Sequence, residues 1–267
     1  MTAHLQLLEV DPVRRFGGVA RLYGEQAAAR LRASHVTVVG IGGVGSWAAE
    51  ALARCAVGRI TLVDMDHVAE SNTNRQIHAL GDAYGRAKVA AMADRIVAIN
   101  PVCDVRPIDD FATVENVRQI VGACDVVLDC IDQVNSKAAL IAHARSSGVA
   151  IVTCGAAGGR IDPSRLARGD LGEIIGDPLL ARVRQRLRRD HGFARASAQR
   201  PVKFGVMAVF SDEPLARPEP TCAESTPAPT GGLACSGYGS TVVVTATMGL
   251  LAAAEALTAL AAGPIRA

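Results

Sequence analysis

The chain has 267 residues, of which 49% are hydrophobic and only 3% aromatic, and its formal net charge is +2. This length suits one large α/β domain or one domain with an appendage, and the apolar content is ample for a packed core. The seven cysteines include no Cys-x-x-Cys pair, which argues against a disulfide framework and a four-cysteine zinc site and indicates a reducing compartment. No apolar stretch occurs at the N-terminus, so no secretory signal peptide is expected.

The N-terminal segment 1–34 is expected to be helical, with a helix over 19–32. The segment that follows, 36–66, predicts a strand, a glycine-rich turn, a helix and a second strand. Its first strand is a β-branched run from Val36 to Val39, as a strand buried on both faces requires. Glycines in the turn allow positive φ and close approach to a ligand, and the next helix would direct its free N–H groups at that ligand.

The turn carries the motif Gly-x-Gly-x-x-Gly at Gly40, Gly42 and Gly45, and Asp64 stands about the expected distance after it. This pattern is typical of dinucleotide-binding Rossmann domains, in which the acid holds a ribose. A nucleotide is therefore expected here. The turn by itself does not distinguish NAD from ATP, and a tight turn without a ligand is the structural alternative.

Downstream of this motif, helix and strand patterns alternate. Helices are predicted over 85–99, 114–121 and 136–147, and strands over 102–108, 124–132 and 149–154. Such alternation argues for an α/β fold with a Rossmann-like, mostly parallel sheet and helices on both faces. The nucleotide-binding core is expected to occupy residues 35–155 of a single domain.

The substrate-side region, 156–210, contains an arginine-rich helix over 178–190 and ends in a predicted strand over 203–210. Apolar residues share one face of the helix: Leu179, Leu180, Val183 and Leu187. Basic residues occupy the rest of it and continue beyond it: Arg182, Arg184, Arg186, Arg188, Arg189 and Lys203. With one acid among them, these charges repel one another unless a polyanion binds, which favours a nucleic-acid partner over a solvated amphipathic helix.

The C-terminal part begins with residues 211–236, which carry five prolines together with Ser, Thr and Gly. This composition predicts a flexible crossover. Residues 237–262 are expected to form a final helix. Its apolar part, 241–262, is long enough to span a membrane, but Glu255 would lie inside the span, so the pattern favours a buried helix over membrane contact.

Residues after the glycine turn indicate which of the two nucleotides, ATP or NAD, the site binds. An NAD enzyme has no need of two cations such as Arg75 and Lys88 at its phosphates. An enzyme that expels pyrophosphate needs them, because charge accumulates on the β- and γ-phosphates in the transition state. Asp132, at the end of another strand, is a candidate ligand for Mg²⁺, which prefers one or two carboxylates with phosphate oxygens and water. The ordinary alternatives are a surface ion pair for Arg75, a solvated helix residue for Lys88 and a helix cap for Asp132.

At these positions the chain resembles the ubiquitin-activating-like adenylyltransferases. The matching segments are GIGGVGS (40–46), LVDMD (62–66), SNTNRQ (71–76), GRAK (85–88) and CDVVLDCID (124–132). The resemblance covers roughly residues 15–155 and implies an adenylation domain. In that family a carboxylate attacks the α-phosphate of ATP, which gives an acyl-adenylate and pyrophosphate.

The resemblance implies roles for individual residues. The ATP-binding residues would be Gly40, Gly42, Gly43, Gly45, Asp64, Asp66, Asn72, Arg75, Lys88 and Asp132. Asp64 would bind the ribose, and Asp132 would coordinate Mg²⁺. Arg75, Lys88 and Asp132 would be catalytic. The family also implies a homodimer in which an arginine of the partner subunit completes the site, and Arg15 and Arg21 are the two candidates.

Further features narrow the resemblance to one branch. Activators of sulfur-carrier proteins usually carry two Cys-x-x-Cys pairs for structural zinc; this chain has none, so no structural zinc is expected. The segments RFGGVARLYG (15–24) and KFGVMAVFSDEP (203–214) and the arginine helix are similar to the tRNA threonylcarbamoyladenosine dehydratases. Those enzymes adenylate the threonylcarbamoyl carboxylate on an adenosine beside the anticodon, and an intramolecular attack then closes a ring with net loss of water.

On this resemblance the partner is tRNA, held by the basic residues of the arginine helix and Lys203, and the compartment is the cytoplasm. A first alternative is adenylation of a sulfur-carrier C-terminus, with a sulfur-transfer or cysteine desulfurase protein as partner. An NAD-dependent oxidoreductase and a non-catalytic nucleic-acid or scaffold protein are the others. Other relatives use a cysteine to accept the activated acyl group; Cys222 and Cys235 are the candidates, and Cys235 is the better placed because it lies beside the return of the chain into the fold.

Overall fold

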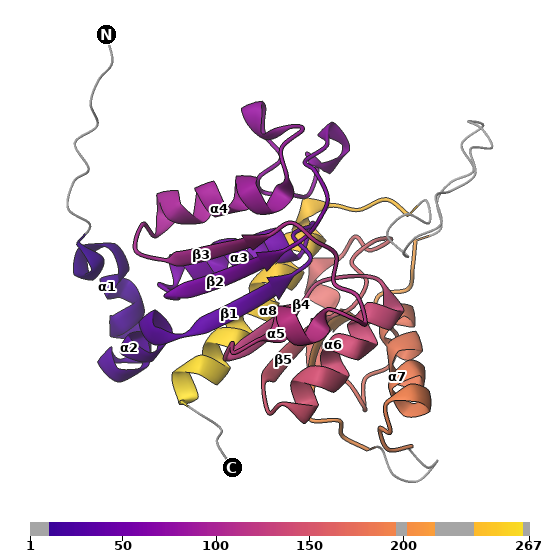
Figure 1. The fold of residues 1–267 in the computed structure, drawn as a ribbon. Coiled ribbons are helices and arrows are strands. Elements are labelled where there is room, and N and C mark those ends of the chain that lie inside the picture. Colours follow the sequence, from indigo (N-terminus) through magenta and orange to yellow (C-terminus); the bar gives the residue numbers. More distant parts are fainter. Residues whose placement is uncertain (1–10, 196–201, 217–237, 264–267) are drawn as a thin grey trace.

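The computed structural model describes residues 11–195, 202–216 and 238–263. Their strands form a seven-stranded sheet in the order β3-β2-β1-β4-β5-β7-β6 (Figure 1). The strands are β1 (His35–Val39), β2 (Arg59–Val63), β3 (Asp104–Ile108), β4 (Val126–Asp129), β5 (Ala150–Cys154), β6 (Leu166–Asp170) and β7 (Met207–Ser211). Neighbouring strands of this sheet are parallel except β6 and β7, which are antiparallel. The predicted α/β class with a mostly parallel sheet is confirmed.

The order of the strands reverses at β1. This strand pairs with β2 on one side and with β4 on the other, so that Val36 lies opposite both Ile60 and Val126. In open α/β sheets, such a reversal leaves a crevice at the carboxyl ends of the two central strands, and ligands bind there. The glycine turn follows β1 and Asp132 follows β4, so the fold brings both to this crevice.

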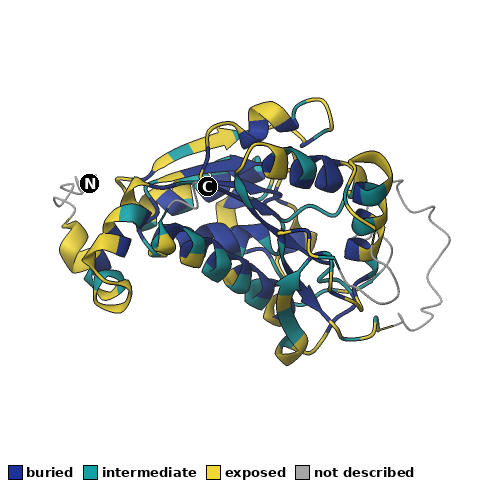
Figure 2. Ribbon diagram, turned by 90° about the horizontal axis from the view of Figure 1, so that it is seen from below, coloured by how far each residue is buried: buried dark blue, intermediate teal, exposed yellow. Residues whose placement is uncertain are grey.

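Helices cover both faces of the sheet. They are α1 (Pro12–Tyr23), α2 (Glu25–Ala33), α3 (Gly45–Arg54), α4 (Lys88–Ile99), α5 (Val117–Val121), α6 (Val134–Ser146), α7 (Pro178–Asp190) and α8 (Val242–Ala262), with 3₁₀ turns η1 (Glu70–Asn72), η2 (Gly81–Ala83) and η3 (Pro163–Arg165). One apolar cluster joins α2, α3, α4 and α8 to one face, and a second joins α5, α6 and α7 to the other. The strands between them are largely buried, whereas α1 is mostly exposed (Figure 2).

Two local features differ from the sequence prediction. The single helix expected over 19–32 is wrong, because Gly24 adopts φ +87° and divides the segment into α1 and α2. The strand β6 (Leu166–Asp170) was not predicted, because its sequence lacks a clear alternation of apolar and polar residues. In the structure its residues are only partly buried. As the edge strand beside β7, it needs apolar contacts on fewer sides than a central strand.

The strand expected over 203–210 begins only at Met207. Immediately before it, the backbone N–H groups of Phe204 and Gly205 donate to the carboxylate of Asp170, both at 2.7 Å. Gly205 has φ +64°, which interrupts an extended strand. The chain therefore turns at this point and enters the sheet four residues later than predicted.

The C-terminal helix α8 packs against the sheet, as its sequence favours. Within the described residues it is the one helix whose length and apolar composition would suit a membrane span, and 44% of its most apolar stretch is buried. Close packing requires a glycine: a Cβ at Gly249 would lie 2.3 Å from the carbonyl oxygen of Val44. Glu255, the acid inside this apolar sequence, forms an ion pair with Arg168 of β6.

Candidate nucleotide-binding site

The glycine turn joins β1 to α3 and lies against the end of β4. Gly40 has φ +88°, and a Cβ at this position would lie 3.0 Å from the carbonyl group of Cys130. A Cβ at Gly45 would lie only 1.8 Å from the carbonyl oxygen of Gly40. The turn itself therefore requires both glycines. Gly42, in contrast, has open space at its Cβ position, and its backbone lines the cavity above the turn.

That cavity has a volume of about 700 Å³, which is in the range of small-molecule sites. Its polar side chains come from Asp64, Asp66, Asn72, Asn74, Arg75, Gln76, Lys88, Asp110, Asp132, Gln133, Tyr238, Ser240 and Thr245. Among the residues predicted to bind ATP, all line this cavity except Gly45, which supports the turn from behind. Residues spread over 93 positions of the sequence, from Gly40 to Asp132, thus meet at one site.

Asp64 lies beneath the glycine turn with only 10% of its side chain exposed. Its Oδ2 accepts a hydrogen bond from the backbone N–H of Ile41 at 2.6 Å, and its Oδ1 accepts one from Asp66 at 2.9 Å. Burial raises the pKa of Asp64, and the positive charge of Lys88 and these two hydrogen bonds oppose that rise. The carboxylate therefore connects the end of β1 to the end of β2.

Lys88 begins α4, and 7% of its side chain is exposed. Its Nζ lies 2.6 Å from Oδ2 of Asp66 and 3.9 Å from Oδ1 of Asp64. The ammonium group is thus held at the cavity wall by two carboxylates. The alternative interpretation of Lys88 as a solvated helix residue is wrong.

Arg75 lies over the glycine turn. A Cβ at Gly43 would lie 3.2 Å from Cγ of Arg75, so the missing side chain makes room for the arginine stem. The Nη1 group donates to the carbonyl oxygen of Ser71 at 2.8 Å and to Oδ1 of Asn74 at 2.9 Å. Trp47 of α3 donates to the carbonyl oxygen of Arg75 at 2.9 Å, which fixes the backbone. Both acceptors of this guanidinium are uncharged, so its positive charge is available to an anionic ligand.

A buried ion pair lies behind the cavity. Asp129 at the end of β4 and Lys137 on α6 have fully buried side chains, with Nζ 2.9 Å from Oδ1. Lys137 also donates to the carbonyl oxygen of Ile131 at 2.8 Å, and Thr153 donates to the other carboxylate oxygen at 2.7 Å. Burial raises the pKa of Asp129, and Lys137 opposes the rise. This network fixes the turn that carries Asp132 to the cavity.

The pair of Asp129 and Lys137 was not predicted from the sequence. One signal was available, because the chain contains only three lysines, Lys88, Lys137 and Lys203. No local pattern places the second of them against a strand end, so only the packing of α6 on β4 and β5 reveals the contact.

The opposite wall of the cavity consists of residues 155–158 and the start of α7. Asp177 caps α7 by accepting from the backbone N–H of Leu180 at 2.9 Å, and it also accepts from Ala156 at 3.0 Å. A Cβ at Gly155 would lie 2.2 Å from Oδ2 of Asp177, so this approach requires glycine. Behind the wall, the fully buried Arg160 places Nη2 3.9 Å from the same oxygen. The beginning of the arginine helix is therefore part of the cavity.

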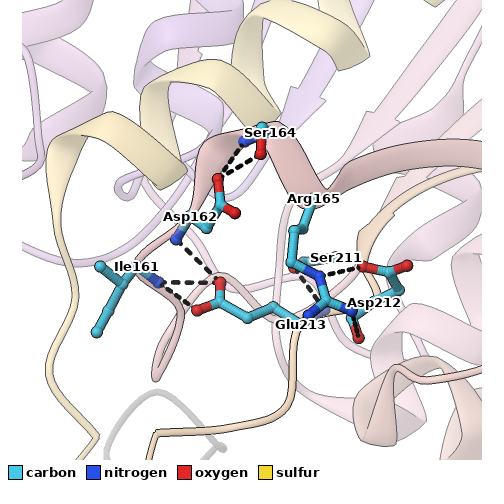
Figure 3. A network of polar contacts seen from close by, with 7 residues as sticks. All are labelled: Ile161, Asp162, Ser164, Arg165, Ser211, Asp212 and Glu213. Carbon is cyan, nitrogen blue, oxygen red and sulfur yellow. Dashed lines mark hydrogen bonds and ion pairs between the residues drawn. The ribbon is translucent and has the colours of Figure 1, made fainter.

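A polar network ties this wall to the end of β7 (Figure 3). Glu213 accepts hydrogen bonds from the successive backbone N–H groups of Ile161 and Asp162, both at 3.0 Å. Nε of Arg165 lies 2.8 Å from Oδ1 of Asp212. The Ser-Asp-Glu-Pro end of the motif over 203–214 thus braces the segment that leads out of the cavity wall, a role that its sequence did not indicate.

The two N-terminal arginines do not reach the cavity of their own chain. Both lie on α1, at the end of the sheet opposite the carboxyl ends of the strands (Figure 1). Nη1 of Arg15 donates to the carbonyl oxygen of Ile99 at 2.7 Å, and Arg21 is exposed in the last turn of α1.

The arginine helix forms over its predicted range and buries the four predicted apolar residues. Its basic residues are unequal. Asp190 forms salt bridges with Arg186 at 2.9 Å and with Arg189 at 2.8 Å, so internal pairing is greater than expected. Arg184 is half-buried, and burial lowers its pKa. Arg182 is exposed, as is Lys203.

The candidate cysteines Cys222 and Cys235 lie outside the described residues. Another cysteine, Cys130, lines the cavity, and its Sγ lies 4.0 Å from Sγ of Cys154 on the neighbouring strand. The pKa of Cys130 is raised, through its contact with the second thiol and through burial, so it is protonated at neutral pH.

The carboxylates of Asp110 and Asp132 both line the cavity, and such a donor set suits Mg²⁺. Among the described residues, no group of three or more His, Cys, Asp or Glu side chains is arranged to hold a metal. An ion at this site would therefore take further oxygen ligands from phosphate groups and water.

The turn, the strand reversal and the converging charges define an α/β protein that binds a nucleotide at its switch point. The ThiF family model matches residues 17–265, and the chain belongs to the ThiF family. A tRNA threonylcarbamoyladenosine dehydratase of Escherichia coli is 50% identical over 250 residues, which cover 91% of this chain and 92% of that protein. A Bacillus subtilis protein of the same name is 38% identical over 191 residues, which cover 71% of each chain.

Solved structures agree with these sequence matches. The crystal structure of the E. coli dehydratase in complex with ATP is 47% identical to this chain, with a TM-score of 0.84, and the match covers 96% of this chain and 98% of that one. A second crystal structure of the same enzyme contains AMP and matches equally well. The resemblance to the adenylyltransferases, which the sequence motifs indicated, is confirmed.

Proposed function

We propose that this chain uses ATP to adenylate the threonylcarbamoyl carboxylate of a modified adenosine beside the anticodon of tRNA, and then promotes its cyclisation with net loss of water. The observation that carries the proposal is the convergence of Arg75, Lys88 and Asp132 on one cavity above the glycine turn. The similarity to tRNA threonylcarbamoyladenosine dehydratases along most of both chains supports the same substrate. An NAD enzyme would not need this arrangement of cations.

The cavity suggests how ATP would lie. Its apolar lining, which includes Phe111, Ile131 and Leu179, suits the adenine base, and Asp64 is placed to accept a hydrogen bond from a ribose hydroxyl. The phosphates would then follow the open backbone of Gly42 toward Arg75 and Lys88. These two cations would stabilise the charge that develops on the leaving pyrophosphate. Mg²⁺ at Asp132 would neutralise further phosphate charge.

The reaction balances without a nucleophile from the protein. A carboxylate oxygen of the substrate attacks the α-phosphorus, the bond to the β-phosphate oxygen breaks, and pyrophosphate leaves. A nucleophilic atom of the same modified nucleoside then attacks the activated carbonyl carbon and loses a proton, and AMP leaves. The sum is one ATP converted to AMP and pyrophosphate and one water lost from the nucleoside. The contribution of the protein is orientation and charge stabilisation.

The active form would be a homodimer. Arg15 and Arg21 lie at the end of the sheet opposite their own cavity, so either one can act only in the site of another subunit. The arginine helix would hold tRNA phosphates beside the cavity, because α7 begins at the cavity wall. We expect the protein in the cytoplasm, where tRNA is available, with a sulfur-transfer or cysteine desulfurase protein as a further partner.

The test is mass spectrometry of tRNA incubated with the protein, ATP and Mg²⁺. We expect the threonylcarbamoyl nucleoside to lose the mass of one water while AMP and pyrophosphate form in equal amounts. Arg75→Ala should lower the rate about 10²-fold or more, because a transition-state charge contact is lost. Pyrophosphate release that depends on a carrier protein ending in Gly-Gly, and not on tRNA, would contradict the proposal. Binding of NAD without binding of ATP would contradict it as well.

A further inference from the structure

A second hollow lies on the side of the molecule away from the glycine turn. It has a volume of about 660 Å³ and lies between α5, the second half of α6 and the segment that follows α7. Its titratable side chains are all basic: Arg118, His143, Arg145, His191 and Lys203. No acidic residue occurs among the described residues that line it. None of these basic residues lines the cavity above the glycine turn or lies on α7, and Lys203 is the one among them that the sequence already predicted to bind tRNA.

Within the described residues, the arginines of the hollow form no salt bridge, unlike two arginines of α7. The nearest acid on α7 is Asp190, and its carboxylate is already engaged by Arg186 and Arg189. Within the described part of the chain, the salt bridges involve neither Arg118 nor Arg145. Several like charges around a concave surface without acids attract a polyanion.

Packed side chains and hydrogen bonds fix the residues at the base of the hollow. Phe204 is 5% exposed and packs edge-on against Phe193, with ring centroids 4.9 Å apart. Arg188 of α7 lies over the ring of Phe204 at 5.3 Å. The carboxylate of Asp170 accepts two backbone N–H groups of the 204–205 turn.

The guanidinium of Arg145 is placed close to the backbone at this turn. A Cβ at Gly205 would lie 3.1 Å from its Nη2, so the glycine allows this approach. Lys203, immediately before the turn, is exposed beside it. The hollow is therefore a shaped basic surface that is supported by packed residues.

The helix α7 connects this hollow to the ATP cavity. Pro178 and Leu179 at its start line the cavity, and His191, directly after its end, lines the hollow. Thirteen helical residues span about 20 Å at 1.5 Å per residue. In Figure 1, α7 runs beside α6 down one side of the sheet. The exposed arginines of α7 thus lie on a path between the two depressions.

We propose that the hollow is a second RNA-contact site, which binds the sugar–phosphate backbone of the tRNA a few nucleotides away from the adenosine in the ATP cavity. The inference rests on the proposed function, because that function supplies the RNA. Phosphates of the tRNA would bind Arg118, Arg145 and Lys203, in the way that the backbone of single-stranded nucleic acid binds the basic grooves of other proteins. Because the hollow lies far from the cavity, it would affect how tightly and in which register the tRNA binds. It would not affect the rate of the adenylation step itself.

The test is the double variant Arg118→Glu with Arg145→Glu, because both side chains are exposed and lie outside the ATP cavity. We expect the affinity for tRNA in 0.1 M salt to fall at least tenfold and the affinity for ATP to stay unchanged. The slope of log K against log salt should become shallower by about 1.4 to 1.8, since two phosphate contacts are lost. The KM for tRNA should rise while kcat at saturating tRNA stays within twofold.

The matched control is Arg106→Glu, an exposed arginine on β3 at the opposite edge of the sheet, which should leave tRNA affinity within twofold. A milder pair, Arg118→Gln with Arg145→Gln, should give the same change of slope and excludes misfolding as the cause. Equal tRNA affinity of wild type and both double variants at every salt concentration would overturn the inference, as would an equal loss in the control. Tighter binding of inorganic phosphate by wild type than by the variants, without an effect on tRNA, would assign the hollow to a small anion and overturn it too.

The experiments distinguish a failure of the proposed reaction from a failure of the second RNA-contact site. If wild type binds tRNA through the hollow but forms no dehydrated nucleoside, the RNA site stands and the proposed reaction does not. If wild type forms the product and the double variants bind tRNA equally well, the reaction stands and the second contact site does not.

Discussion

Among single residues, Lys137 supports the site without lining the cavity. Its ammonium group is fully buried and holds both the carboxylate of Asp129 and the carbonyl oxygen of Ile131. Removing one partner of such a pair leaves an uncompensated charge in a medium that solvates it poorly. The turn before Asp132 would also lose the hydrogen bonds that fix it.

We therefore expect Lys137→Ala to lower the free energy of unfolding by about 3–5 kcal/mol, measured by urea denaturation. The double variant Asp129→Asn with Lys137→Met removes both charges and should recover a large part of this loss. Equal stability of the single variant and wild type would show that the pair is not buried as described. A double variant that regains stability but stays inactive would indicate that the pair positions Asp132.

A second buried group, His78, predicts how stability depends on pH. It is 3% exposed, neither ring nitrogen has a hydrogen-bond partner among the described residues, and burial lowers its pKa to about 4. The unfolded chain takes up a proton near pH 6.5, whereas the folded chain does so only near pH 4. Between these values the unfolded state binds more protons, so stability decreases as the pH falls, by up to about 3 kcal/mol for the whole interval.

We expect His78→Leu to remove this contribution from the slope of unfolding free energy between pH 6.5 and 4, measured by urea titrations at several pH values. His67→Leu replaces an exposed histidine in the same way and is the matched control variant, measured over the same pH range. An unchanged slope in His78→Leu would place the acid sensitivity in other groups.

Among the secondary-structure elements, α7 is the helix that we propose to hold the tRNA, and its arginines are unequal. Its sequence alone does not distinguish one arginine of the helix from another. The structure distinguishes them, because Arg184 is half-buried and Arg188 lies over Phe204. Changing either of these two would disturb packing as well as charge. Arg182 and Arg189 are the exposed members.

We accordingly expect Arg182→Ala with Arg189→Ala to weaken tRNA binding and to make its salt dependence shallower by about 1 to 2 in the slope of log K against log salt. ATP binding and the helix content should stay the same, as circular dichroism would show. Gln185→Ala, an exposed change on the same helix, is the control and should have no effect. A tRNA affinity that does not respond to the arginine changes would remove α7 from the RNA-binding surface.

At the scale of the whole molecule, the position of α1 is decisive. Its arginines lie at the opposite end of the sheet from the cavity, whereas the family resemblance implies that an arginine of the partner subunit completes the site. The apolar side chains of Val13 and Leu22 on α1 are each 79% exposed, which suits a helix that packs on a second subunit. A symmetric dimer satisfies both observations, because each α1 can then serve the other site.

Mixing two inactive variants tests this arrangement. An Arg15→Ala or Arg21→Ala chain retains a complete cavity, and an Asp132→Ala chain retains the N-terminal arginines. In a mixed dimer, one site combines the intact parts of both chains, so an equal mixture should recover about a quarter of the wild-type activity. The mixture that includes the functional N-terminal arginine variant should regain activity, and each variant alone should not. Activity that never exceeds that of the separate variants would contradict a site shared between subunits.

Much of the fold and of the site was determined by the sequence within single elements. The run Val36 to Val39, the glycine turn and Asp64 follow one another along the chain, and each is constrained by its own backbone and side chains. The same holds for the apolar face and proline start of α7. Asp132 was also predicted, because parallel strands deliver their carboxyl ends to one edge of a sheet. Arg75 and Lys88 were predicted from the charge on a leaving pyrophosphate and from the family resemblance.

Only the tertiary structure decided which distant residues meet. The pair of Asp129 and Lys137, the brace formed by Glu213 and the basic hollow join elements that are separated in sequence, and their residue types alone predict no partner. The edge strand β6 likewise forms because it pairs with β7, since its own sequence shows no strand pattern. Local patterns report the backbone and one face of each element, whereas contacts between elements depend on how the faces pack. Sequence therefore located the nucleotide site, and packing determined how its walls are held and where a second basic surface lies.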